Sequence, residues 1–235
     1  MSSKIWDSHA VSAKQLDKQI LAWETARGQR LATPVSQRPA VEDFVSISRQ
    51  VGVGGLEIAD LLGKKLGWAV FDQELLRRMA GDDAVRERIY ASMDERDVGW
   101  FEETVRSLTD PKFVRNDYFH RLTQTVLTIA RQGHAVFLGR GAGLVLPEDA
   151  GFRVRIVAPL EIRLAGFVKR TGLSTNAAKG EMARVEHDRN EFVSTHFHRN
   201  VEDPLLYDLT VNVARLTPAQ AVEVILAVRT HMGRR

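Results

Sequence analysis

The sequence predicts an α/β protein with a parallel β-sheet covered by helices. Short runs rich in β-branched and aromatic residues alternate with longer segments whose apolar residues recur at helical spacing. Crossover helices between successive strands are typical of parallel sheets. The chain has 235 residues, of which 44% are hydrophobic and 27% charged, and it contains no cysteine. A chain of this size buries enough surface to fold without disulfides or a structural metal.

Residues 1–40 are predicted to form an N-terminal helical extension and a linker. Leu16, Ile20 and Trp23 lie at i, i+4 and i+7 within residues 14–27, so they form an apolar stripe on a helix. A polar stretch with two prolines follows and is typical of a linker. The stripe needs a surface to cover it, which makes this helix a candidate for contact with another protein.

Residues 41–235 are predicted to form the main domain. Its first half predicts strands over 43–48 and 68–72, helices over 55–66 and from 73 to 79, and mostly helix over 83–132. Its second half predicts strands over 134–139, 152–158 and 207–213, and helices over 160–170, 174–198 and 218–231. In the strand over 152–158, Arg153 and Arg155 alternate with apolar residues. This strand therefore lies near a sheet edge, or its arginines reach out at one end.

A glycine-rich loop joins the first strand of this domain to its first helix. Gly52, Gly54 and Gly55 let the backbone curl tightly, so that N–H groups at the start of the helix can converge on phosphate oxygens. The pattern favours a phosphate-binding loop over a plain turn. A dinucleotide-binding loop is a weaker alternative: Asp72 would contact the ribose, but Glu57 stands where that motif needs its third glycine.

Three segments resemble the cytidylate-kinase-like family: "ISRQVGVGGLEIADLLGKKLGWAVFDQELL", "VFLGRGAGLVLPEDAGFRVRIVAPLEIRLAGFVKR" and "YDLTVNVARLTPAQAVEVI". The resemblance covers about residues 43–228 in order. It implies a three-layer P-loop NTPase fold with a parallel sheet, a helical insertion that binds the monophosphate, and a lid. It also implies that ATP, with Mg²⁺, donates its γ-phosphoryl group to CMP or a similar small acceptor.

The resemblance assigns a nucleotide-phosphate loop to Arg49, Gly52, Val53, Gly54, Gly55, Leu56 and Glu57. The lysine of a kinase loop is missing, because it would stand at Gly55 or, in a register shifted by one, at Leu56. Arg49 is the nearest arginine that would compensate. Glu57 stands at or beside the usual hydroxyl position, where it would hold Mg²⁺.

The resemblance also implies a site for the monophosphate acceptor, formed by Asp72, Arg78, Arg140, Arg184 and Asp188. Arg140 and Arg189 are the expected catalytic residues. Because a guanidinium grips phosphate through two parallel hydrogen bonds, a phosphoryl-transfer site collects arginines from several segments. Asp72 serves equally well as the cap of the following helix.

Two functions remain open at this point. The dispersed arginines favour a nucleoside monophosphate kinase, whereas the missing lysine favours a degenerate nucleotide-binding sensor or scaffold. The net charge of +3 is spread along the chain, so nucleotides rather than nucleic acids are the expected partners. No run approaches the roughly 18 apolar residues of a membrane span, and the N-terminal residues "MSSKIWDSHAV" lack the apolar core of a secretory signal, which predicts a cytoplasmic protein.

Overall fold

The computed structural model describes residues 18–23, 25, 41–83, 87, 117–139 and 141–232. At its centre lies a five-stranded sheet in the order β2-β3-β1-β4-β5, in which every neighbouring pair is parallel. The strands are β1 (Phe44–Arg49), β2 (Ala69–Asp72), β3 (Ala135–Leu138), β4 (Phe152–Val157) and β5 (Leu209–Asn212). The predicted parallel sheet is therefore confirmed.

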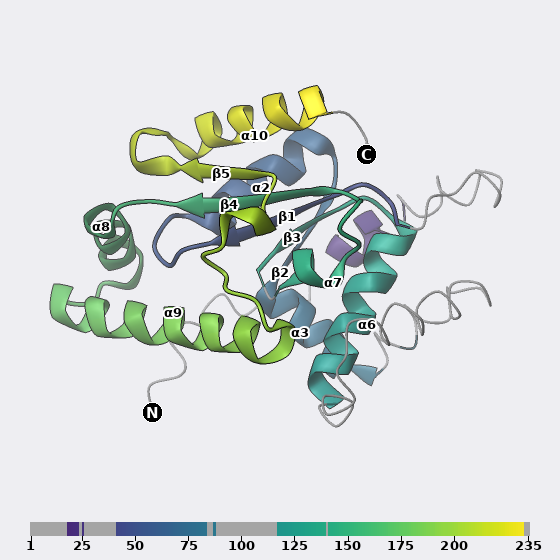
Figure 1. Cartoon of the computed structure of the whole chain (residues 1–235), viewed down its shortest axis with the longest axis horizontal. Coiled ribbons are helices and arrows are strands. Elements are labelled where there is room, and N and C mark those ends of the chain that lie inside the picture. The colour runs from purple at the N-terminus through teal and green to yellow at the C-terminus, as the bar shows by residue number, and fades with distance from the viewer. Residues whose placement is uncertain are drawn as a thin grey trace.

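Helices cover both faces of the sheet (Figure 1). One face is covered by α2 (Gly55–Leu66) and α10 (Pro218–Met232), the other by α3 (Gln73–Gly81), α6 (Asp117–Gln132) and α7 (Ala142–Val145). Helices α8 (Leu160–Thr171) and α9 (Thr175–Phe197) pack together beyond the carboxyl end of β4. Two short 3₁₀ turns, η3 (Pro204–Leu206) and η4 (Val213–Arg215), flank β5.

Alternation along the strands divides the core into two layers. Phe44, Phe71 and Phe137 point to the face that packs on α3 and α6, whereas Ile47 and Ile156 point to the face covered by α2 and α10. The ends of the strands and of α2, α3, α8, α9 and α10 lie within two residues of the predicted ones. Helix α6 ends where the predicted helical region over 83–132 ends, and α7 and the two 3₁₀ turns were not predicted. Most of the predicted helical region over 83–116 lies outside the described residues.

Strand β4 lies one position in from the sheet edge, between β1 and β5, and both of its arginines are buried. The Arg153 guanidinium donates to five main-chain carbonyl oxygens at 2.5 to 3.3 Å, those of Gly143, Leu146, Pro147, Glu148 and Ala150. Burial lowers the pKa of Arg153, against the effect of the nearby Asp208 carboxylate. Arg153 therefore attaches α7 and the segment that follows it to strand β4.

The described part of the N-terminal helix, residues 18–23 and 25, packs on the main domain. Ile20 and Trp23 are buried, and Trp23 Nε1 donates to the carbonyl oxygen of Ile129 at 3.2 Å. The Gln19 side chain accepts a hydrogen bond at 3.0 Å from the backbone N–H of Val70 in the edge strand β2. Two residues of the predicted apolar stripe, Ile20 and Trp23, are thus covered by the same chain, and the third, Leu16, lies outside the described residues. The predicted linker before residue 41 lies outside the described residues.

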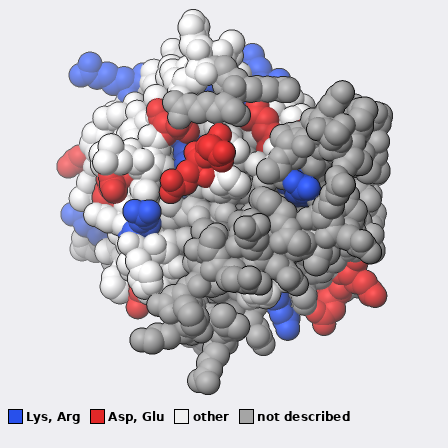
Figure 2. Space-filling view, turned by 45° about the vertical axis from the view of Figure 1, so that its right-hand side comes forward, with Lys and Arg blue, Asp and Glu red and all other residues white. Residues whose placement is uncertain are grey.

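Charged side chains of both signs are interspersed on the face shown in Figure 2. Within the described part of the chain, no helix combines the length and the apolar character that crossing a bilayer requires.

Candidate functional site

A cavity of about 970 Å³ opens at the carboxyl ends of the central strands. Its lining includes the glycine loop, the end of β3, residues of β4 and one side of α9. In open parallel sheets, ligands bind beyond the carboxyl ends of the strands, where the chain leaves neighbouring strands in opposite directions. Strand β1 lies at such a point, because its neighbours are β3 and β4.

The glycine loop has the backbone conformation that the sequence predicts. Gly52 has φ of 99° and Gly54 has φ of 73°, values that residues with side chains rarely adopt. Helix α2 begins at Gly55, and Gly54 at its N-cap offers no side chain to satisfy the first N–H groups. These N–H groups, together with the helix dipole, favour an anion at this end of α2.

Arg49, the last residue of β1, extends over the loop toward β3. A Cβ atom placed on Gly55 would lie 2.9 Å from Arg49 Cγ, and one on Gly139 would overlap the guanidinium and lie 3.1 Å from Cζ. The approach to Cγ is shorter than real Cβ contacts, and a side chain at position 139 would have to displace the end of the Arg49 side chain. The absence of side chains at Gly55 and Gly139 therefore leaves the path that the Arg49 side chain follows through the cavity, from the loop to the end of β3.

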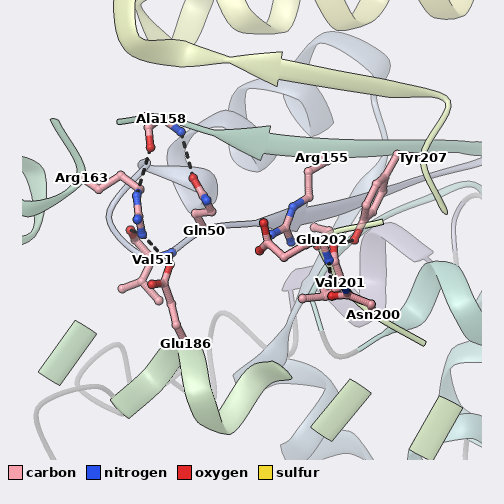
Figure 3. Close-up of polar contacts among 11 residues, drawn as sticks. Gln50, Val51, Arg155, Ala158, Arg163, Glu186, Asn200, Val201, Glu202 and Tyr207 are labelled. Carbon is pink, nitrogen blue, oxygen red and sulfur yellow. Dashed lines mark hydrogen bonds and ion pairs between the residues drawn. The ribbon is translucent and has the colours of Figure 1, made fainter. Parts of the chain in front are cut away.

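Helices α8 and α9 hold the first half of the loop (Figure 3). The Glu186 carboxylate accepts hydrogen bonds from the backbone N–H of Val51 at 3.2 Å and from Arg163 Nη1 at 2.5 Å. Helix α8 comes so close that a Cβ atom on Gly166 would lie 2.9 Å from the carbonyl oxygen of Gly52. The loop is thus fixed by an ion pair and by backbone packing.

Glu57 lies in the first turn of α2, where the helix dipole favours a carboxylate, and its side chain is exposed at the cavity. Burial lowers the pKa of Arg170, and the Glu57 carboxylate acts against that shift. Arg170 also lines the cavity, from the last turn of α8. The positive charge of Arg170 therefore partly offsets the negative charge of Glu57 beside the loop.

The two acceptor residues expected at and near α3, Asp72 and Arg78, differ in whether they reach the cavity. Asp72 lines the cavity and caps α3, because its Oδ1 accepts from the backbone N–H of Leu75 at 2.8 Å. The capping alternative is confirmed, and the cap leaves Asp72 at the cavity wall. Arg78 is exposed in the last turn of α3 and is not among the described residues that line the cavity.

Helix α9 brings Arg184, Asp188 and Arg189 to the cavity. Arg184 is exposed and bonds to Glu181 at 2.6 Å and to Asp188 at 2.9 Å, one turn away on the same helix. These partners raise the pKa of Arg184. Arg189 is partly buried on the same helix.

Another arginine, Arg155, enters the cavity from β4. Its Nη1 donates to Ser48 Oγ at 2.8 Å and its Nη2 to Glu202 Oε1 at 2.5 Å. The guanidinium lies 5.7 Å from the centre of the Tyr207 ring. All four residues line the cavity. Figure 3 shows Arg155 reaching from β4 toward Glu202 and Tyr207.

Residues 44–215 match the model of a protein family described as the cytidylate kinase-like family. The match spans well over half of the chain. The chain belongs to the cytidylate kinase-like family. The fold that the sequence resemblance implied, a P-loop NTPase sheet with flanking helices, is therefore confirmed. Membership supports a nucleotide kinase at the level of the family.

Individual relatives agree with this assignment. The cytidylate kinase of Halobacterium salinarum is 24% identical over 183 residues, which cover 78% of this chain and 87% of that protein. The cytidylate kinase of Ignicoccus hospitalis is 28% identical over 185 residues, 77% of this chain and 95% of that one. A solved structure of an uncharacterized protein from Eubacterium ventriosum superposes with a TM-score of 0.64 at 17% identity, over 79% of this chain and 97% of that chain. This last similarity concerns the fold alone.

The cavity of this family member unites most of the residues singled out from the sequence. The whole loop from Arg49 to Glu57 lines it, as do Asp72, Arg184, Asp188 and Arg189. Arg140 lies outside the described residues, although Gly139 and Gly141 on either side of it are described, and both have positive φ.

Sequence reasoning did not assign three arginines of the cavity to the site: Arg153, Arg155 and Arg170. Arg155 carried a signal, since a charged residue on an internal strand must be paired or face a ligand. Arg170 carried none, because a basic residue in the last turn of a helix is ordinary. The cavity also contains the acid Glu202, which lies between α9 and η3 in a stretch without helical or strand pattern.

Proposed function

We propose that the protein is a nucleotide kinase of the cytidylate type, which transfers the γ-phosphoryl group of ATP to CMP or a similar small acceptor. The observation that carries the proposal is the course of Arg49 across Gly55 to Gly139. This course puts a guanidinium between the loop and the end of β3, in the part of the cavity where donor and acceptor would meet. Arg49 supplies the positive charge that the missing loop lysine would supply.

The loop performs the donor side of the reaction. N–H groups at the start of α2 bind the phosphate oxygens of ATP, and Arg49 neutralises charge on the transferred group. Phosphoryl transfer needs little covalent chemistry from the protein, so catalysis rests on positioning and on charge stabilisation. The hydrogen bonds of Glu186 to the Val51 N–H and to Arg163 contribute to this positioning, since they hold the loop in its conformation before the nucleotide binds.

The acceptor side is built by α9 and the segment after β3. Arg189 and Arg184 bind the acceptor phosphate together with Arg140, and Asp72 and Asp188 contact the polar groups of the nucleoside. Arg78 is the weakest member of this set, because its side chain lies on the exposed surface of α3. In this scheme the arginines come from β1, α9 and the β3–α7 connection, so that both phosphate groups meet positive charge.

Magnesium fits the residues that are present. No group of three or more His, Cys, Asp or Glu side chains among the described residues is arranged to hold a metal ion. Mg²⁺ does not require one, because it binds through one or two carboxylates plus substrate phosphates and water. Glu57 would supply the carboxylate at the loop. When bound, the ion would neutralise charge on the phosphates of ATP.

The alternative is a degenerate sensor that binds a nucleotide without turnover. The absence of a loop lysine favours it, and the Arg49 geometry opposes it, since a sensor does not need a guanidinium between donor and acceptor. The two functions differ in one product, the nucleoside diphosphate.

Nucleotide binding and transfer are measured together to test the proposal. In a thermal unfolding series with Mg²⁺, a nucleotide at 100 times its Kd is expected to stabilise the folded chain by about 2.7 kcal/mol. With ATP and CMP present, we expect CDP and ADP to accumulate in equal amounts, as read by chromatography. If ATP raises the unfolding midpoint but neither CDP nor the diphosphate of any other acceptor forms, the protein is the sensor. No shift with any nucleotide would reject both functions.

A further inference from the structure

We propose that Arg155 and Ser48 form a further part of the acceptor-phosphate site in the cavity, where the single phosphate group of the acceptor, also bound by Arg184 and Arg189 from α9, replaces the carboxylate of Glu202 on Arg155. The inference deepens the proposed function and rests on it for the identity of the acceptor. The subsite itself consists of Arg155 and Ser48, with Glu202 and Tyr207 beside them.

The two arginines of β4 are paired in different ways. Arg153 directs its donors to main-chain carbonyl oxygens, which are fixed parts of the fold. Arg155 instead pairs with two side chains, and both of them line the cavity. Arg153 is therefore a structural fastening, whereas Arg155 holds partners that a ligand is able to displace.

The ion pair of Arg155 and Glu202 is unequal in exposure. The Arg155 side chain is 6% exposed and that of Glu202 is 55% exposed. An arginine buried to this extent needs a counter-ion, because leaving it unpaired costs several kcal/mol. Glu202 can turn into water at little cost, since more than half of its side chain is already hydrated. The buried cation is thus fixed and its anion is exchangeable.

The segment that carries Glu202 is held by local contacts. It follows His198, the one residue other than glycine with positive φ among the described residues, and the backbone N–H of Glu202 bonds to Asn200 Oδ1 at 3.0 Å. The Tyr207 hydroxyl donates to the carbonyl oxygen of Val201 at 2.8 Å. None of these contacts uses the Glu202 carboxylate, so its release from Arg155 leaves them in place.

The donors around Arg155 define the class of ligand. The carboxylate of Glu202 shows that an oxyanion fits against the guanidinium, and Ser48 adds a hydroxyl at 2.8 Å from the same group. A planar guanidinium beside a hydroxyl suits a phosphate oxygen. Ser48 precedes Arg49 in β1, and its Cα partner in β4 is Arg155. The subsite therefore lies beside the phosphate loop without being part of it.

Glu202→Gln tests the exchange directly. Inorganic phosphate, titrated against the thermal midpoint at constant ionic strength, is expected to act on this variant at about one tenth of the concentration that the unaltered protein requires, the order of one charged hydrogen bond. Arg155→Met should abolish this gain in the double variant. Glu223→Gln is the matched control, since it removes the same charge from an exposed pair with Lys65 and should change nothing. Equal phosphate responses of Glu202→Gln and the unaltered protein, or a gain that persists without Arg155, would overturn the subsite.

The ligand source is separated in a second titration. Affinity for CMP, measured by calorimetry without ATP, should rise about tenfold in Glu202→Gln, whereas affinity for cytidine should not change. A rise for inorganic phosphate but not for CMP would reject the acceptor as the occupant. The product assay tests the proposed function separately. If the phosphate response depends on Arg155 but ATP phosphorylates no acceptor, the subsite is supported and the kinase function is rejected.

Discussion

Arg49→Met is expected to lower the rate of phosphoryl transfer by about 100-fold or more in a chain that remains folded. The methionine keeps most of the length of the side chain and removes the guanidinium from the gap between Gly55 and Gly139. A charged contact that strengthens in the transition state affects turnover more than ground-state binding. We therefore expect kcat for ADP formation to fall further than the affinity for ATP.

The control for this variant is Arg215→Met. Arg215 is exposed on η4 and is not among the described residues that line the cavity. Its replacement removes the same charge and should leave both kcat and the ATP affinity unchanged. If Arg49→Met transfers phosphoryl groups as fast as the Arg215 control, Arg49 does not replace the loop lysine.

Arg153→Met is expected to destabilise the fold by about 3 kcal/mol or more. The substitution removes a buried guanidinium that satisfies carbonyl oxygens over residues 143–150, and methionine offers those oxygens no donor. Chemical denaturation with urea, followed by circular dichroism, measures the loss as a lower midpoint.

Arg184→Met provides the comparison for that measurement. Its side chain is exposed and its partners Glu181 and Asp188 lie on the same helix, so its removal should shift the urea midpoint little. Equal midpoints for the two variants would show that Arg153 does not fasten the segment after α7.

Periodicity and glycine placement were enough to predict the five strands and the ends of most helices, but not α7 or the start of α6. Gly52 and Gly54 predicted a curled loop, and both have positive φ in the structure. Alternation in the strand over 152–158 predicted a strand near a sheet edge or arginines that reach out at one end, and β4 lies one position in from the edge with Arg155 at the cavity. These features depend on neighbours in sequence, so local patterns suffice to find them.

Contacts between distant segments could not be predicted in this way. The brace from Glu186 to Val51 joins residues 135 positions apart, and the pair of Arg155 with Glu202 joins residues 47 apart. The sequence also gave no reason to connect Gly139 with Arg49, because their proximity arises only when β3 pairs with β1. For Arg140, the residue after Gly139, the sequence-based role in catalysis stays a prediction.

The arrangement at the loop also changes what a restored lysine would do. From the sequence alone, a lysine at position 55, or at position 56 in the shifted register, would restore the lysine of the kinase motif. In the structure, its Cβ atom would lie 2.9 Å from Arg49 Cγ, so the two side chains compete for one space. Gly55→Lys by itself should therefore weaken ATP binding rather than strengthen it.

The central claim is that Arg49 takes the place of the loop lysine, and the exchange of the two residues tests it most directly. Three variants, Arg49→Gly, Gly55→Lys and the two combined, are compared in kcat for ADP formation with ATP and CMP. We predict that each single variant loses activity by about 100-fold and that the combined variant recovers most of it, because it restores a glycine and a lysine to the positions of a conventional loop. A Gly55→Lys variant more active than the unaltered protein, or a combined variant no more active than Arg49→Gly, would contradict the claim.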